Sequence, residues 1–299
     1  MPKAIRDIVG VIPLPVKLAV AALVALALLL GAAYALSRVR ARQFRRQREE
    51  LLEDVGLLQA ALLPKVPDRL GGLSVSVAYR PAAGLAAGGD FYDAFELDDG
   101  RVAFILGDVS GHGREALSHT TIVHYTLRAY LEAGLEPRQV LGITDRAIGG
   151  KLGGVFATVV VAVYEPSTGA LIYASAGHPP PLVLGPVDHE AVTELSCPPI
   201  GVGLLPTGRR QTSVRLPAGC QVCLYTDGLA EARVDGELLG RGRLAEMLTG
   251  LDDAAQSLIY AVHAEADDAS DDMAACVFST GGRAAGVGER ASRSSRSTS

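Results

Sequence analysis

A run of 19 residues without a charged side chain, from Leu18 to Leu36, is the feature that most limits how this chain can fold. As an α-helix it would cover most of a bilayer core of about 30 Å. The run exceeds the apolar region of about 7–15 residues found in secretory signal peptides. The sequence Ala33-Tyr34-Ala35 does resemble a signal-peptide cleavage site, so a signal peptide is the alternative. We predict a transmembrane helix over residues 14–36, preceded by a short N-terminus (residues 1–13).

The distribution of basic residues predicts the orientation of this helix. Six arginines lie within residues 38–48, whereas residues 1–17 carry three basic residues. Basic residues mark the cytoplasmic side of a membrane helix. We therefore expect a single-pass protein of the cell membrane with everything after Leu36 in the cytoplasm. The reducing cytoplasm would keep the four cysteines as thiols, and the CQVC pair at Cys220 and Cys223 is interpreted as strand residues rather than half a zinc site.

Residues 37–70 are predicted to form a basic juxtamembrane segment and a linker helix. Four apolar residues repeat there with the spacing of coiled-coil a and d positions, namely Leu51, Val55, Leu58 and Leu62. The repeat lasts less than three heptads, so it indicates either a homodimer through the linker helix or packing against the protein's own core. Pro64 and Pro67 should end the helix.

From Gly71 the pattern changes to short apolar runs separated by turn residues. The turn EPSTG at residues 165–169 joins two such runs, so those strands should pair antiparallel. Helical periodicity is expected at residues 114–133, 137–151, 241–248 and 254–266. Strands in hairpins and helices in blocks favour an α+β fold with antiparallel sheet layers faced by helices. We assign this domain to residues 71–279 and a disordered tail to residues 280–299.

The net charge of −5 is divided unevenly along the chain. Residues 1–62 carry +4 and residues 281–299 carry +3, so the region between them carries −12. A region this acidic is a poor surface for nucleic acid, because phosphate backbones need basic side chains. Clustered carboxylates suit hard divalent cations instead.

Several carboxylates lie at the ends of predicted strands. Asp90 precedes one strand and Asp108 ends the next, so a hairpin would bring both to the same end of a sheet. Asp227 follows a third strand, and Asp271 and Asp272 precede the last one. Clustered carboxylates repel one another unless cations neutralise them. The sequence therefore predicts a centre with two metal ions held by aspartate oxygens and water.

Seven motifs between about Gln59 and Phe278 jointly resemble one family. They are LQAALLP, YRPA, GGDFYD, GDVSGHG, FATVVVAVYEPSTGALIYASAGHPPPLV, LYTDGLAEAR and DDMAACV. In these motifs the chain resembles the PPM-type metal-dependent serine/threonine phosphatases, in the bacterial branch named after the stage II sporulation protein E phosphatase. The resemblance implies an αββα sandwich with Mn²⁺ or Mg²⁺ bound in a channel at the sheet edges.

The resemblance also implies roles for individual residues. Asp90 and Asp108 would be core metal ligands with catalytic roles, the carbonyl of Val109 would contribute, and Asp227 and Asp271 would complete the second metal's shell. The motif DDMA departs from the family at Ala274, where a hydroxyl residue is common. This departure leaves the ligand Asp271 intact, so it bears on rate rather than on activity.

The resulting hypothesis is hydrolysis of phosphoserine or phosphothreonine by a metal-activated water. By the resemblance, the substrate is a phosphorylated anti-sigma-factor antagonist in bacterial signalling. Two alternatives remain, namely a catalytically silent membrane adaptor with the same fold and a phosphoesterase of small molecules. His112 and His178 invite a general-acid role, but loop-stabilising hydrogen bonds explain them equally well. Ser110 has no evident histidine and aspartate partners for nucleophilic catalysis.

Overall fold

The computed structural model describes residues 13–81, 88–111, 114–187, 189, 197–203, 211–249, 251, 254–267 and 271–281. Three sequence predictions therefore lie wholly or largely outside the described residues, namely the short N-terminus at 1–13, the tail at 280–299 and the role of His112. The chain divides into two compact units, Met1–Asp54 and Val55–Ser299, and each is considered by itself.

The long helix α2 (Leu14–Leu62) makes up the described part of the first unit and continues into the second. Its stretch Leu14–Phe44 is long and apolar enough to cross a membrane, by length and composition. Within that stretch, the guanidinium of Arg38 lies 4.9 Å from the centre of the Tyr34 ring. The helix ends at Leu62, two residues before the predicted stop at Pro64. Side chains of residues 45–62 are outside the described set, so pairing through the linker helix stays a prediction.

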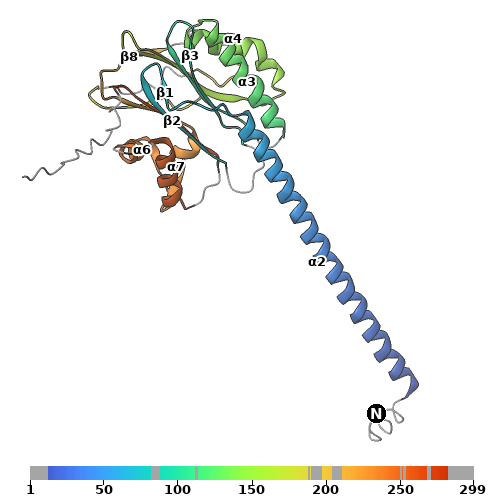
Figure 1. The fold of residues 1–299 in the computed structure, drawn as a ribbon. Helices are drawn as coiled ribbons and strands as arrows, with labels where there is room; N and C mark the ends of the chain where they lie inside the picture. The colour runs from blue at the N-terminus through green and yellow to red at the C-terminus, as the bar shows by residue number, and fades with distance from the viewer. Residues whose placement is uncertain are drawn as a thin grey trace, which may run out of the picture. The chain divides into compact units, whose positions relative to one another are not determined.

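The second unit contains two five-stranded antiparallel sheets and a separate hairpin (Figure 1). Sheet A has the strand order β1 (Arg69–Leu70), β2 (Leu73–Arg80), β12 (Met273–Ser279), β9 (Gln221–Tyr225) and β7 (Leu182–Leu184). Sheet B has the order β3 (Phe91–Glu96), β4 (Val102–Val109), β5 (Ala157–Glu165), β6 (Ala170–Ala176) and β8 (Thr212–Arg215). The separate hairpin pairs β10 (Arg233–Val234) with β11 (Glu237–Leu238).

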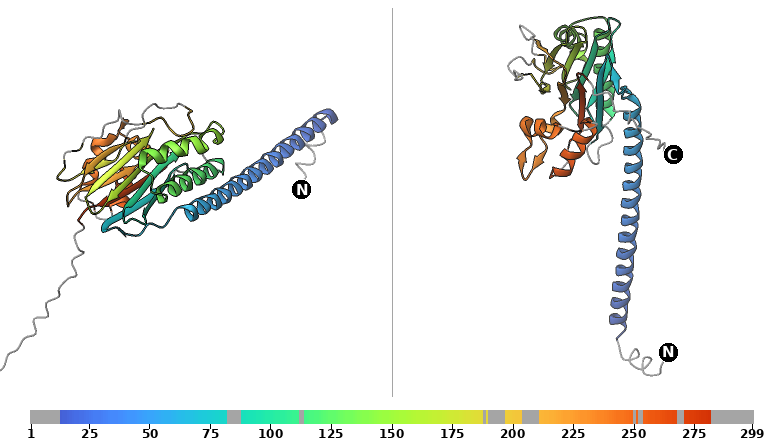
Figure 2. Two further views of the ribbon diagram at one scale, coloured as in Figure 1. Left: turned by 90° about the horizontal axis from the view of Figure 1, so that it is seen from above. Right: turned by 60° about the vertical axis from the view of Figure 1, so that its left-hand side comes forward.

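Helices cover the outer face of each sheet (Figure 2). Sheet B packs against α3 (Arg114–Glu132) and α4 (Pro137–Ile148), which the 3₁₀ helix η1 (Gly149–Lys151) follows. Sheet A packs against α6 (Gly240–Leu248) and α7 (Ala254–Glu265), while the short α5 (Asp227–Ala230) follows β9. This arrangement confirms the predicted fold of two antiparallel sheets flanked by helices.

Side-chain alternation along the strands builds the core in three layers. In β4, Ile105 packs toward the α3 and α4 side, whereas Phe104 packs between the sheets. The rings of Phe104 and Phe278 stack with centroids 4.2 Å apart and join the two sheets. By the same alternation, Asp108 and its partner Thr158 in β5 face the space between the sheets.

The four helices predicted after residue 71 and the longer predicted strands are confirmed, with ends that differ by no more than three residues. Five strands were not predicted, namely β1, β7, β8, β10 and β11. Each has two to four residues, which is too short to show a periodicity in the sequence.

Candidate metal centre

The hairpin of β3 and β4 places two candidate ligands side by side. Phe91 pairs with Gly107, so Asp90 and Asp108 are the next residues at the same end of sheet B. In sheet A, Ala275 pairs with Tyr225, so the residues after β9 and before β12 also meet at one end. The two ends adjoin, because Thr226 Oγ1 lies 2.9 Å from Asp90 Oδ2. The structure thus brings the predicted ligands to one edge of the sandwich.

Glycines at this edge allow the backbone to approach the carboxylates closely. A Cβ atom on Gly89 would lie 2.0 Å from the carbonyl oxygen of Val109 and 2.2 Å from Asp108 Oδ1. A Cβ atom on Gly88 would lie 1.1 Å from Asp272 Oδ2, and one on Gly228 would lie 2.0 Å from the carbonyl oxygen of Asp272. The close atoms at Gly89 and Gly228 include backbone oxygens, so only glycine fits at these two positions, whereas a side chain at Gly88 would displace the Asp272 carboxylate.

Burial and mutual repulsion shift the acidity of the carboxylates. Burial, followed by the charge of Asp108, raises the pKa of Asp90 well above its usual value. Burial, followed by the charges of Asp227, Asp271 and Asp272, raises the pKa of Asp108 to about 7. Burial, followed by the charge of Asp271, also raises the pKa of Asp227. The charges that raise these pKa values all belong to carboxylates, so the ionised set requires neutralisation by cations.

The carboxylates differ in their exposure to solvent. Asp90 and Asp272 are 2% and 4% exposed, and we call them the inner carboxylates. Asp227 is half-buried and Asp271 is exposed, and we call these two the outer carboxylates. Asp108 is also half-buried, and its charge interacts with members of both groups. The outer side adjoins a cleft of about 320 Å³ whose lining includes Asp271.

The donor set suits divalent cations even though it is not gathered around one point. Among the described residues, no group of three or more His, Cys, Asp or Glu side chains is close enough to hold one ion. The aspartates instead spread along the edge as interacting neighbours, with Val109 O close to Asp108 at the glycine turn. Oxygen donors of this kind fit Mn²⁺ or Mg²⁺.

Thr226 is a site residue that the sequence did not reveal. Its side chain is fully buried, and its hydroxyl contacts Asp90 Oδ2. The backbone N–H of Ala274 donates to Thr226 Oγ1 at 2.9 Å, and the N–H of Thr226 donates to the carbonyl of Ala274 at 3.0 Å. Position 274 therefore takes part through its peptide groups, which any residue other than proline would provide.

A buried ionic cluster fixes helix α3 to the strand that follows Asp90. Asp93 is 1% exposed, and its Oδ2 lies 2.8 Å from both His124 Nε2 and Arg128 Nη1. The Arg128 guanidinium also lies 4.0 Å from the centre of the Phe95 ring. This cluster was not predicted from the sequence, because His124 and Arg128 are 31 and 35 residues away from Asp93.

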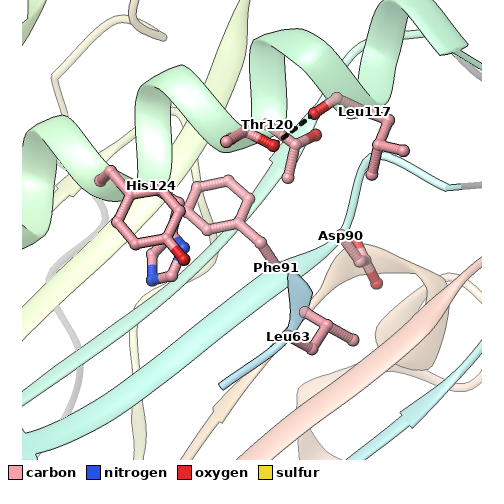
Figure 3. Close-up of a pocket in the computed structure, with 8 residues that line it drawn as sticks. Leu63, Asp90, Phe91, Leu117, Thr120 and His124 are labelled. Atoms are coloured by element: carbon pink, nitrogen blue, oxygen red, sulfur yellow. Dashed lines mark hydrogen bonds between the residues drawn. The ribbon is translucent and has the colours of Figure 1, made fainter. Parts of the chain in front are cut away.

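A small pocket of about 20 Å³ lies beside Asp90 between β3 and α3 (Figure 3). Leu63, which directly follows α2, and Phe91 line it together with Thr120 from α3. Thr120 Oγ1 also lies 3.4 Å from the carbonyl oxygen of Gly89. The first residue after the long helix therefore lies next to a candidate ligand.

Two other residues singled out in the sequence have structural roles. His178 is 3% exposed, with Nδ1 lying 3.0 Å from Thr158 Oγ1 and Nε2 lying 3.1 Å from the carbonyl of Tyr225. Burial lowers the pKa of His178 to about 4. Ser110 Oγ accepts a hydrogen bond from the N–H of Phe156. These contacts favour the loop-stabilising interpretation for His178 and Ser110.

Cys220 and Cys223 are buried residues at the start and in the middle of the β9 region. Burial raises the pKa of both thiols, that of Cys223 to about 12. Such thiols stay protonated and do not favour metal binding. The interpretation of the CQVC pair as strand residues agrees with this burial.

Comparison with known proteins identifies the family. The profile of the stage II sporulation protein E (SpoIIE) family matches residues 98–281, more than half of the chain. The chain therefore belongs to the SpoIIE family of PP2C-type phosphatase domains, as the motifs predicted.

Individual relatives support the assignment. Protein IcfG of Synechocystis sp. is 28% identical over 229 residues, which cover 66% of this chain and 35% of that protein. Phosphoserine phosphatase RsbU of Bacillus subtilis is 27% identical over 196 residues, which cover 64% of this chain and 56% of that protein. This chain thus corresponds to about a third and about a half of the two relatives' lengths.

A solved structure shows the same fold. The crystal structure of the RsbU and RsbW domains of Rv1364c from Mycobacterium tuberculosis superposes with a TM-score of 0.60 and 28% sequence identity. The match covers 73% of this chain and 61% of that chain.

Proposed function

We propose that this chain is a membrane-anchored, metal-dependent phosphatase that hydrolyses phosphoserine or phosphothreonine in a protein substrate. The observation that carries the proposal is the sandwich edge where Asp90, Asp108 and Asp227 all have raised pKa values. Divalent cations neutralise such a set, and the same cations suit the chemistry of phosphate esters. The family assignment and the likeness to a protein named phosphoserine phosphatase support the same activity.

The predicted ligands would bind two metal ions. Asp90, Asp108 and the carbonyl of Val109 would hold one ion, and Asp227 and Asp271 would complete the shell of the second. When bound, two Mn²⁺ or Mg²⁺ ions would neutralise the phosphate dianion and activate a water molecule as nucleophile. The cleft beside Asp271 would give a polypeptide access to the outer side of the centre.

The location and partner of the enzyme are part of the proposal. The stretch Leu14–Phe44 supports a single membrane span, and the six arginines within residues 38–48 support a cytoplasmic catalytic domain. The substrate we propose is a phosphorylated anti-sigma-factor antagonist, because the motifs and the likeness to RsbU point to that branch. A homodimer through the linker helix is compatible with this arrangement.

The decisive experiment uses the full chain purified in detergent. With Mn²⁺ present, we expect release of phosphate from phosphoserine proteins, and EDTA should abolish it. Asp108→Asn should be inactive, whereas Asp98→Asn, a change of an exposed aspartate in the β3–β4 turn, should be fully active. Activity on small phosphoesters alone would favour the small-molecule phosphoesterase. Inactivity on every substrate would favour the silent adaptor.

The orientation is tested separately. Alkaline phosphatase needs export to be active, so its fusion after Ser299 should be inactive if the C-terminus is cytoplasmic. An active fusion would contradict the proposed topology and support the signal-peptide alternative.

A further inference from the structure

Thr226 connects the two sheets at the candidate metal centre. It follows β9 of sheet A, whereas Asp90 precedes β3 of sheet B. Their side chains meet at 2.9 Å, although the two residues are 136 positions apart in the sequence. Both side chains are almost completely buried, so water does not compete for this contact.

The direction of the hydrogen bond follows from the partners of the hydroxyl. The N–H of Ala274 donates to Thr226 Oγ1 at 2.9 Å, which uses an oxygen lone pair and leaves the hydroxyl proton available. Asp90 Oδ2 at 2.9 Å is the nearer acceptor, since the carbonyl oxygen of Ala274 lies at 3.5 Å. The hydroxyl therefore donates to Asp90 Oδ2, and Oδ1 is the oxygen left to bind a cation.

The contact between Thr226 and Asp90 takes the place of a helix-capping hydrogen bond. Thr226 is the N-cap residue of α5, where a threonine hydroxyl commonly caps the first turn of the helix. Its side chain makes no such cap bond. The hydroxyl instead lies between the peptide of Ala274 and the carboxylate of Asp90.

We infer that Thr226 is a positioning residue for metal binding, which holds the Asp90 carboxylate of sheet B in register with the ligands of sheet A. The inference rests on the metal centre proposed above. Asp227 directly follows Thr226 in the chain. Thr226 therefore contacts the inner carboxylate of Asp90 and is also adjacent in sequence to the outer carboxylate of Asp227. Partners that orient a metal ligand in this way commonly account for a tenfold to hundredfold share of metal affinity.

The test measures Mn²⁺ binding by the full chain in detergent, through the electron paramagnetic resonance signal of free Mn²⁺. Thr226→Val removes the hydroxyl and keeps the branched shape, and we expect its Kd for Mn²⁺ to rise about tenfold or more. Thr226→Ser keeps the hydroxyl and should bind with an affinity close to that of the wild type. If the valine variant does not fold, Thr226→Ala provides the same test. It removes the hydroxyl and the γ methyl group and adds no new atoms.

Thr144→Val is the matched control. Thr144 in α4 is fully buried like Thr226, but its hydroxyl oxygen has no hydrogen-bond partner among the described residues. The exchange should leave the Kd for Mn²⁺ unchanged. A second control places Thr226→Val in an Asp90→Asn background, where it should cause little further loss because its target carboxylate is already gone.

A purely structural role gives a different result. Loss of the hydroxyl leaves the N–H of Ala274 unpaired, so the melting temperature of metal-free Thr226→Val should fall in either case. If the Kd for Mn²⁺ of the folded valine and alanine variants equals that of the wild type, the positioning role is wrong. The titration needs no hydrolysis, so wild-type protein that binds Mn²⁺ but releases no phosphate would contradict only the proposed function. Wild-type protein that binds no Mn²⁺ would contradict both.

Discussion

The inner and outer carboxylates occupy the same edge of the sandwich but depend on different parts of the protein. Asp90 and Asp272 are nearly inaccessible, and Asp90 receives a hydrogen bond from the other sheet. Each outer carboxylate accepts a hydrogen bond from the N–H of the next residue, Asp227 from Gly228 and Asp271 from Asp272. The inner carboxylates thus require long-range packing, whereas the outer ones require only a local turn. Changes that disturb the packing around Asp90 should therefore have larger effects than changes in the local turns of the outer carboxylates.

The largest effect is expected at Asp108, whose charge interacts with both groups. Asp108→Asn should lower turnover by about a thousandfold or more, because loss of a metal ligand would remove several kcal/mol of charge stabilisation. Its metal-free form should be at least as stable to urea as the wild type, since carboxylate repulsion is relieved. Phosphate release and urea unfolding measure the two outcomes. Near wild-type turnover would refute the ligand role of Asp108.

The next largest effect should come from filling the glycine turn. A Cβ atom in Gly89→Ala would meet Val109 O at 2.0 Å and Asp108 Oδ1 at 2.2 Å, so the turn must move. A displacement of about 1 Å at a reacting centre commonly lowers turnover by about a hundredfold. Gly242→Ala in α6 is the control, because its Cβ would meet nothing within 4 Å. The control should keep full turnover and gain up to about 1 kcal/mol of stability.

A smaller effect should distinguish the two adjacent aspartates before β12. Asp271→Asn should raise the Mn²⁺ concentration needed for half-maximal activity by about tenfold, as expected for an exposed ligand that water can partly replace. Asp272→Asn should have a weaker effect, because losing its charge also relieves repulsion on Asp90 and Asp108. Mn²⁺ titrations of phosphate release compare the variants. The reverse order would transfer the ligand role to Asp272.

The sequence predicted those features that are local in the chain. The strands of five or more residues were recognised from their own apolar runs, and the acidic residues at their ends indicated the site. Thr226 was missed because no local sequence pattern indicates its contact with Asp90, which is 136 residues away. The inner position of Asp272 was missed because two adjacent aspartates look equivalent until the backbone directs one inward. The cluster of Asp93, His124 and Arg128 was missed because charged residues on a helix or strand usually face water.

The last effect is on the stability of the fold rather than on turnover, and it concerns a second link between the sheets. His178 joins Thr158 of sheet B to Tyr225 of sheet A, with one ring nitrogen accepting and the other donating. Its pKa is lowered from 6.5 to about 4 by burial. Between these two pH values His178 is therefore neutral in the folded protein but protonated in the unfolded chain. The stability that neutral His178 provides is complete above pH 6.5 and is lost as the pH falls toward 4.

This linkage predicts a loss of about 2 kcal/mol in unfolding free energy between pH 7.5 and pH 5 from this residue alone. His178→Gln keeps a donor and an acceptor but does not titrate, so the wild type should lose more stability than the variant over this range. Urea unfolding followed by tyrosine fluorescence measures both, since the chain has nine tyrosines and no tryptophan. Parallel pH profiles for the two proteins would show that His178 is not held neutral. His178 would then accept a proton in the folded protein. Water would have to reach its ring more easily than its 3% exposure indicates.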